Sequence, residues 1–313
     1  MGTDVLLIAA GPSSGRTSAP YFKAVEALFE REEQRFSRFR RDSELSLMNA
    51  AGGAKDLSPE MWDVLICAKR WWRETGGIFD PSVLPALLRA GYDAPFDTVS
   101  RRLRSGSLTG LPELRPLAWF QDVEMNGEDG HRDVRLENGV QVDLGGIVKG
   151  WTVDRAAEAL APLGDFLIDA GGDIAARGSC TDGDGWWVSV EDPLRPGEDS
   201  QMLLLKDRSV ATSSSRRRRW RTAEGAQAHH LIDPGSGVPA ETGVVSVTVT
   251  GGSAEACDVW AKATLIRGLE AGVRALEAAD GFEGLITLDD GATLSTSGWE
   301  GRQHQQETVA AGT

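Results

Sequence analysis

The sequence predicts an α+β fold in which antiparallel sheets pack against separate helices. Runs of β-branched and apolar residues recur at hairpin spacing in the second half of the chain. Helical apolar patterns stand apart from these runs and do not alternate regularly with them, which argues against a repeated βαβ unit. No repeat with a period of roughly 20–50 residues indicates a solenoid.

In the N-terminal third, the opening Met1–Ile8 is typical of a strand, and the Gly/Pro/Ser-rich stretch 11–20 ends it. Apolar residues at helical spacing predict an amphipathic helix over Tyr21–Phe36. A second helix is expected after Ser58, because Ser58 suits the N-cap and Pro59 the first helical position. Its apolar face is expected to consist of Trp62, Leu65, Ile66 and Trp72.

In the remaining chain, Gly91–Asp133 is expected to mix a short helix with a hairpin. The alternation in Val140–Leu144 predicts a strand, followed by a glycine turn and a helix over Val148–Leu160. Ser253 and Gly268 bound a helix over Ala254–Ile266. Further strands are predicted at Phe166–Ile168, Trp186–Val190, Gln201–Leu205, Val244–Thr250 and Gly284–Leu288.

The 313 residues carry 33 Lys and Arg against 47 Asp and Glu, a net charge of −14. This balance disfavours nucleic acid and anionic membranes as partners, since both require a positive face. Cys67, Cys180 and Cys257 lie far apart without metal-site spacing. The N-terminal apolar run Val5–Ala10 is too short to span a membrane. We therefore expect a cytoplasmic protein with no membrane span, unless a leader has been lost, with one domain over residues 1–302 and a polar tail over 303–313.

Two glycine-containing stretches could bind phosphate. The stretch Asp143–Gly150 connects the strand predicted at Val140–Leu144 to a helix, but its spacing is not that of a Walker A loop and no Ser or Thr follows Lys149. No GxGxxG sequence is present, so binding of NAD is not expected. The second stretch, Asp169–Asp173, is equally consistent with a plain turn between two strands.

Three polar groups remain open to a functional or a structural explanation. His230 lies three residues before Asp233, and such a pair is more often structural than catalytic. The run Arg216–Arg219 could bind phosphate or form a solvated loop. Asp258 and Lys262 are spaced i, i+4 on a helix and can form an ion pair among apolar neighbours, where a functional role is expected.

The order of motifs resembles the FAD:protein FMN transferases, the ApbE family, over residues 1–298. The resemblance is carried by the following segments, in chain order: Met1–Thr3, Phe36–Phe39, Asp42–Leu45, Asn49, Gly76–Pro81, Asp143–Gly146, Lys149–Gly150, Asp154, Gly171–Asp173, Ala211–Ser213, His230–Pro234, Gly237 and the helix that contains Asp258. It implies a two-lobed, T-fold-like α+β architecture with FAD in a cleft between the lobes.

The resemblance also implies a reaction, in which FAD is cleaved at its pyrophosphate, FMN is attached to a Thr or Ser of an acceptor flavoprotein, and AMP is released. His230 corresponds to a histidine near the chemistry, and with Asp258 and Lys262 it forms the catalytic set that we predict. The backbone carbonyl of Gly146 and the carboxylate of Asp258 correspond to the ligands of Mg²⁺. The FAD contacts correspond to Met1, Phe39, Ile78, Phe79, Asp80, Asp143, Lys149 and Ile232.

Lys262 departs from the family pattern, because relatives commonly have Thr at this position as a further metal ligand. An ammonium donates hydrogen bonds and cannot bind a cation, so Lys262 either replaces the metal or weakens its site. His230 could instead orient its own loop through Asp233. The sequence therefore leaves three functions open: transfer of FMN to a protein, hydrolysis of FAD to FMN and AMP, and binding of FAD without reaction.

Overall fold

The computed structural model describes residues 3–10, 17–105, 120–181, 183–222 and 225–303. Its centre is a seven-stranded sheet in which every neighbouring pair is antiparallel. The sheet strands, in spatial order, are β1 (Val5–Ala9), β5 (Phe166–Ala170), β6 (Asp173–Arg177), β9 (Arg208–Ser214), β14 (Val244–Gly251), β15 (Glu283–Leu288) and β16 (Thr293–Ser295).

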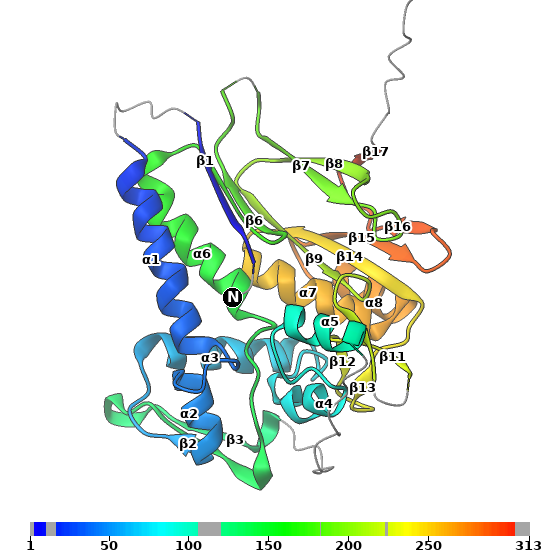
Figure 1. Ribbon diagram of the computed structural model, residues 1–313. Helices are drawn as coiled ribbons and strands as arrows, with labels where there is room; N and C mark the ends of the chain where they lie inside the picture. Colours follow the sequence, from blue (N-terminus) through cyan, green and yellow to red (C-terminus); the bar gives the residue numbers. More distant parts are fainter. Residues whose placement is uncertain (1–2, 11–16, 106–119, 182, 223–224, 304–313) are drawn as a thin grey trace, which may run out of the picture.

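Helices cover one face of this sheet and a smaller sheet covers the other (Figure 1). The helices are α1 (Ala19–Phe36), α6 (Val148–Leu160), α7 (Ala254–Arg267) and α8 (Leu269–Glu277). The smaller sheet has the order β17 (Arg302–Gln303), β8 (Asp199–Leu205) and β7 (Trp186–Glu191). Strand β5 shows the alternation that this requires, since Ile168 packs toward the helices and Leu167 toward the smaller sheet.

A second lobe, drawn below the sheet in Figure 1, consists mainly of helices. It contains α2 (Glu44–Ala51), α3 (Pro59–Glu74), α4 (Leu84–Arg89), α5 (Phe96–Ser105) and a sheet of order β2 (Gly53–Ala54), β4 (Asp133–Leu136) and β3 (Val123–Asn126). Two small hairpins pair β10 (Arg219–Arg221) with β11 (Gln227–His229), and β12 (Ile232–Asp233) with β13 (Val238–Pro239). Short 3-10 helices occur at Pro81–Val83, Phe120–Asp122, Glu128–Gly130, Glu137–Gly139 and Ala161–Leu163.

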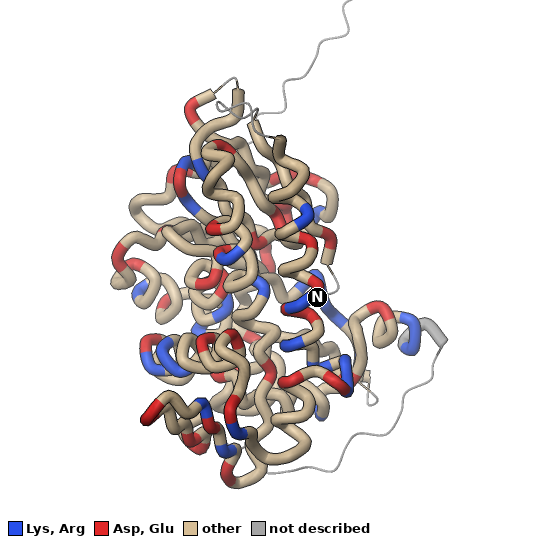
Figure 2. The backbone as a smooth tube through the Cα atoms, turned by 90° about the vertical axis from the view of Figure 1, so that its left-hand side faces the viewer, with Lys and Arg blue, Asp and Glu red and all other residues tan. Residues whose placement is uncertain are grey.

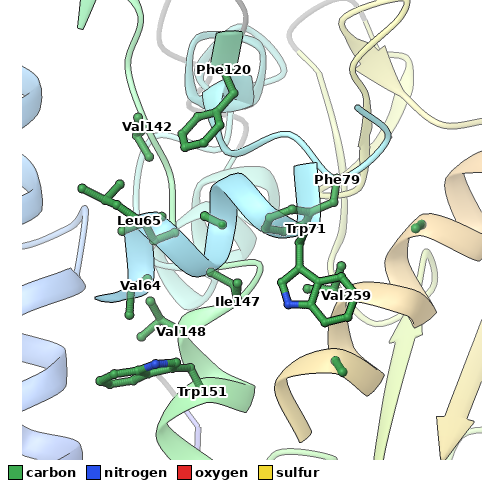
Figure 3. Close-up of a cluster of buried hydrophobic side chains, with 14 of the residues drawn as sticks. Val64, Leu65, Trp71, Phe79, Phe120, Val142, Ile147, Val148, Trp151 and Val259 are labelled. Atoms are coloured by element: carbon green, nitrogen blue, oxygen red, sulfur yellow. The ribbon is translucent and has the colours of Figure 1, made fainter. Parts of the chain in front are cut away.

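One hydrophobic core joins the two lobes. Leu65 and Trp71 of α3 pack in the same cluster as Ile147, Val148 and Val259 (Figure 3). Helix α7 is the centre of this arrangement, because nearly its whole length is buried between α6, α8 and the sheet. Its buried polar residues Glu255, Asp258 and Thr264 are therefore held in place by packing.

Most of the predicted elements are confirmed, and three expectations are wrong. The predicted strand at Val140–Leu144 is half buried but joins no sheet. The side-chain amide of Asn49 forms the hydrogen bonds of Val142 instead: it donates to the carbonyl and accepts from the N–H group, each at 2.8 Å. In α3 the buried face contains Met61, Val64, Leu65, Ala68 and Trp71, whereas Ile66 is 48% exposed. The N-terminal strand begins at Val5 rather than near Met1.

Candidate functional site

A two-residue glycine turn links β5 to β6 and presents one carboxylate. Ala170 pairs with Asp173, and Gly171 and Gly172 between them have φ of +62° and +93°. Positive φ at both positions is the conformation of a type I′ hairpin turn, in which glycine is favoured because it has no side chain to clash. The turn therefore places the fully buried Asp173 at the end of the sheet.

Lys149, in the first turn of α6, contacts this glycine turn. Its Nζ lies 2.6 Å from Asp173 Oδ1 and donates a hydrogen bond to the carbonyl of Gly171 at 3.3 Å. Its side chain is 21% exposed, whereas that of Asp173 is completely buried. The ion pair thus has one end inside the protein and one end that a ligand can reach.

Helix α7 contributes the second ion pair. The side chain of Ser253 caps the helix by accepting from Ala256 N, and Asp154 accepts from the N–H groups of Ala254 and Glu255 at 2.8 and 2.9 Å. One turn along, Lys262 Nζ contacts Asp258 Oδ1 and donates to the carbonyl of Asp258 at 3.3 Å. The i, i+4 pair expected from the sequence is therefore confirmed, with side chains only 14% and 3% exposed.

The loop before α6 lies directly against Lys262. A Cβ added to Gly146 would lie 3.5 Å from Lys262 Cε and 3.3 Å from Phe79 Cε2. Phe79 follows α3 and is held there because its N–H donates to Thr75 Oγ1 at 3.0 Å. Segments from both lobes therefore meet at Lys262.

Asp173 and Asp258 are electrostatically linked, and Asp173 and His230 both feel the charges of Lys149 and Lys262. Burial, and after it the charge of Asp258, raises the pKa of Asp173 to about 7, against the lowering effect of Lys149 and Lys262. Burial, followed by the charges of Arg218 and Lys262, holds the pKa of His230 well below its usual value of 6.5. His230 is partly exposed as a residue, but its Nδ1 is enclosed and has no hydrogen-bond partner. His230 is therefore uncharged at neutral pH.

A third cation, Arg38, connects two further residues of the predicted set. Arg38 Nε lies 3.2 Å from Asp143 Oδ2, and its guanidinium lies 4.1 Å from the ring centre of Phe39. It also lies 4.6 Å from the ring centre of Tyr92. Asp143 in turn accepts from Gly145 N at 2.8 Å, so the pair shapes the loop that leads to Gly146.

The remaining predicted residues make contacts of their own. Asp80 is buried and accepts from Ser82 N at 2.7 Å and from Trp72 Nε1 at 3.2 Å, so its carboxylate organises a turn inside the protein. Burial raises its pKa, against the lowering effect of these hydrogen bonds. Ile78 is partly buried, Ile232 is buried, and Met1 lies outside the described residues.

The structure does not support a pairing of His230 with Asp233. Asp233 accepts from Gly235 N at 2.9 Å and from Ser236 Oγ at 2.8 Å, and no His230–Asp233 bond is found within the described part of the chain. Arg38, Asp173 and Arg218 are not in the predicted site, although Asp173 and Arg218 lie in stretches for which phosphate binding was left open. The Gly-Gly-Asp and Phe-Ser-Arg-Phe motifs contain two of them, but neither motif specifies which distant residue becomes the partner.

A cavity lies apart from these ion pairs. A cavity of about 500 Å³ borders the N-terminal end of α7 and is lined by Arg70, Asp154, Arg177 and Glu255 among others. It shares no residue with the predicted site.

No helix among the described residues is long and apolar enough to cross a membrane. Acidic and basic residues are interspersed along the chain in the view of Figure 2.

Comparison with known proteins identifies the family. The ApbE family model matches residues 1–286. The chain belongs to the ApbE family. The FAD:protein FMN transferase of Treponema pallidum is 27% identical over 317 residues, covering 91% of this chain and 82% of that protein. The Vibrio cholerae protein of the same name is 28% identical over 270 residues, covering 81% and 75%.

Solved structures agree with the α+β fold. The ApbE protein of Thermotoga maritima superposes with a TM-score of 0.77 at 25% identity, covering 94% of this chain and 97% of that one. The flavinyl transferase ApbE of Pseudomonas stutzeri has a TM-score of 0.73 at 22% identity, covering 94% and 95%. The resemblance inferred from the order of the motifs is thereby confirmed, as is the ApbE-like architecture.

Proposed function

We propose that this protein is an FAD:protein FMN transferase. The observation that carries the proposal is the convergence of two ammonium groups, Lys149 and Lys262, on two buried carboxylates beside an uncharged histidine. Cations at fixed positions are what phosphoryl transfer requires of a protein, because most of the catalysis is positioning and charge neutralisation. Relatives that carry this name match the chain over most of its length.

The proposed reaction transfers FMN to a hydroxyl group. The hydroxyl oxygen of a Thr or Ser in the acceptor flavoprotein attacks the phosphorus of the FMN half of FAD. The bond from this phosphorus to the bridging oxygen of the pyrophosphate breaks, and AMP leaves with the electron pair. FMN then remains attached to the acceptor through a phosphoester, and the hydroxyl proton passes to a base.

His230 is proposed as that base. It is uncharged at neutral pH, which is the form able to accept a proton, and its Nδ1 is not committed to any hydrogen bond. The cations that lower its pKa, chiefly Arg218 and Lys262, also make a protonated His230 short-lived. The proton would therefore be passed on readily, for instance to the phosphate of the departing AMP.

The FAD contacts implied by the resemblance are proposed to divide between the pyrophosphate and the rest of the FAD molecule. Lys149 and Lys262 would bind the pyrophosphate oxygens. The apolar and aromatic residues Phe39, Ile78, Phe79 and Ile232 would line the remainder of the FAD site. Asp80 and Asp143 would act mainly by shaping the backbone around it, because protein donors already occupy their carboxylates. The role of Met1 stays a prediction.

The experiment that tests this function follows both products. The protein is incubated with FAD and an acceptor domain containing a flavinylation Thr, and flavin fluorescence in a denaturing gel is compared with AMP release. Transfer predicts a fluorescent acceptor and one AMP for each FMN attached. AMP without a labelled acceptor would instead mean hydrolysis, and FAD binding without AMP would mean a binding protein.

Two variants test the proposed base. His230→Gln should lower AMP release by about 100-fold or more, since general-base catalysis typically contributes this much. His131→Gln is the matched control, because His131 is 58% exposed in the β3–β4 region and belongs to no part of the site. Equal activity of both variants would remove His230 from the mechanism.

A further inference from the structure

We propose that the ammonium of Lys262 supplies the positive charge for the FAD pyrophosphate, so that this protein cleaves FAD without a divalent metal ion. The inference rests on the proposed function and concerns the place where the family resemblance implies Mg²⁺. That metal would be held by Asp258 and the carbonyl of Gly146. The residues that surround this place do not fit it.

The first reason is that the ammonium of Lys262 already occupies oxygen atoms of Asp258. Asp258 Oδ1 and the carbonyl of Asp258 both accept from Lys262 Nζ. Mg²⁺ requires nearly ideal octahedral coordination by oxygen, and an ammonium beside the same carboxylate repels it. Asp258 Oδ2 is the one side-chain oxygen of this pair without a partner, and an ion bound to it would lie beside the ammonium that already holds Oδ1 of the same carboxylate.

The second reason is steric. The Lys262 stem runs along Gly146, within contact distance of any Cβ placed there, and Phe79 closes the other side. Helix α7 is buried along nearly its whole length, so Lys262 has a fixed origin at this place. The stem therefore lies against the same glycine whose carbonyl the family resemblance assigns to the metal.

The third reason comes from the donors of the ammonium. An ammonium has three N–H donors, and Lys262 directs two of them at oxygen atoms of Asp258. The third donor remains for a ligand, and the side chain is 14% exposed, so it is within reach from outside. Lys262 can thus hold Asp258 and one phosphate oxygen simultaneously, which is the bridging role that a metal ion would perform.

Among the described residues, no group of three metal-capable side chains includes Asp258. In the described part of the chain, the group of three metal-capable side chains close enough to share an ion is Asp56, His131 and Asp133. Asp56 and His131 are exposed, and all three belong to the β2–β4–β3 region of the other lobe. Exposed acidic groups of this kind are common in proteins without a bound metal ion.

Metal binding provides a test that does not depend on activity. Mn²⁺ is titrated into the protein, with and without FAD, and free Mn²⁺ is measured by electron paramagnetic resonance. We expect no saturable binding to the unmutated protein in the micromolar range. Lys262→Thr, which supplies a hydroxyl oxygen and removes the ammonium, should bind Mn²⁺ at least about tenfold more tightly. Saturable micromolar binding by the unmutated protein would overturn the proposal.

Two controls accompany this titration, one for the positive charge of Lys262 and one for the position of the replacement. Lys262→Arg keeps the positive charge and should remain unable to bind Mn²⁺. Arg274→Thr is the matched control, because Arg274 forms the same i, i+4 arrangement with Glu270 on α8 but is 71% exposed. Its Mn²⁺ binding should equal that of the unmutated protein. Equal binding by Lys262→Thr would show that Lys262 does not determine metal access.

The activity measurement distinguishes this proposal from the proposed function. AMP release by the unmutated protein should change less than roughly twofold between EDTA and excess Mg²⁺. Lys262→Thr should require Mg²⁺. AMP release abolished by EDTA and restored by Mg²⁺ would refute the metal independence while leaving the transferase function intact. If AMP is absent under all conditions the transferase function fails, and the Mn²⁺ titration still decides whether Lys262 excludes a metal.

Discussion

The ammonium of Lys149 lies 2.6 Å from the carboxylate of Asp173 and so joins the first turn of α6 to the turn between β5 and β6. The two residues are 24 positions apart and belong to different elements. Because Asp173 is completely buried, its charge depends on nearby cations, chiefly Lys149. The pair is therefore a structural element as well as a proposed phosphate contact.

Replacing the cation should destabilise the fold. Lys149→Met retains most of the stem but removes the closest cation from buried Asp173, which should cost about 3–5 kcal/mol of unfolding free energy above pH 7, where Asp173 is ionised. Urea unfolding followed by tryptophan fluorescence measures the change in the free energy of unfolding. Lys23→Met, at an exposed position of α1, should change it by less than about 0.5 kcal/mol. A Lys149 variant as stable as this control would mean that water reaches Asp173.

The pH dependence of stability should reveal the same carboxylate. The pKa of Asp173 rises from its usual 3.8 to about 7 on folding, so between these values the folded protein keeps a proton that the unfolded chain releases. Its contribution to the free energy of unfolding is therefore greatest at low pH and decreases as the pH rises toward 7.

Asp173→Asn removes this dependence. The compared quantity is the free energy of unfolding of the variant minus that of the unmutated protein. This difference should rise by about 1 kcal/mol per pH unit between pH 5 and 7 and stay constant above pH 7. Urea titrations at several pH values measure the difference. The lowered pKa of His230 produces the opposite slope, but it is present in both proteins and cancels. A constant difference across this range would contradict the raised pKa.

Local sequence signals predicted much of the fold because they act within one element. Ser58 and Ser253 cap α3 and α7 as their positions before the apolar patterns indicate. Asp258 and Lys262 meet because an i, i+4 spacing on a helix brings them together in any context. The glycine turn at Gly171 follows equally from two adjacent residues that both tolerate positive φ.

Long-range contacts could not be predicted in this way. Alternating apolar residues in Val140–Leu144 indicate burial on one side, which the structure confirms, but not whether another strand supplies the hydrogen bonds. Here Asn49 supplies them, from 93 residues away. Likewise the contact of Arg38 with Asp143 depends on the packing of two lobes, and nothing in either segment specifies the other. The partner of each charged group is therefore known only from the structure.

Asn49 should be important for the loop that carries Asp143 and Gly146. Asn49→Ala leaves the N–H and the carbonyl of buried Val142 without partners, which should cost about 2–3 kcal/mol of unfolding free energy. Amide hydrogen exchange should increase locally at residues 140–147. Asn126→Ala in β3, whose side chain accepts a single exposed bond from Glu128 N, serves as the comparison and should leave that exchange unchanged. Unaltered exchange in the Asn49 variant would mean that the loop holds its shape without these bonds.

Asp258 should be required for cleavage of FAD because it holds the ammonium of Lys262 in place. Asp258→Ala removes the carboxylate, frees Lys262 to leave the position beside Gly146, and should lower AMP release by about 100-fold or more. Asp258→Asn retains one oxygen that can accept from Lys262, so it should lose less activity than the Ala variant.

Glu270→Ala is the control for this prediction, because it removes the acidic partner of the exposed pair on α8 and should leave AMP release unchanged. Circular dichroism and FAD fluorescence quenching check that each variant is folded and binds flavin. Activity of Asp258→Ala within roughly twofold of the unmutated protein would exclude both a metal at this carboxylate and the positioning of Lys262 as requirements for the reaction.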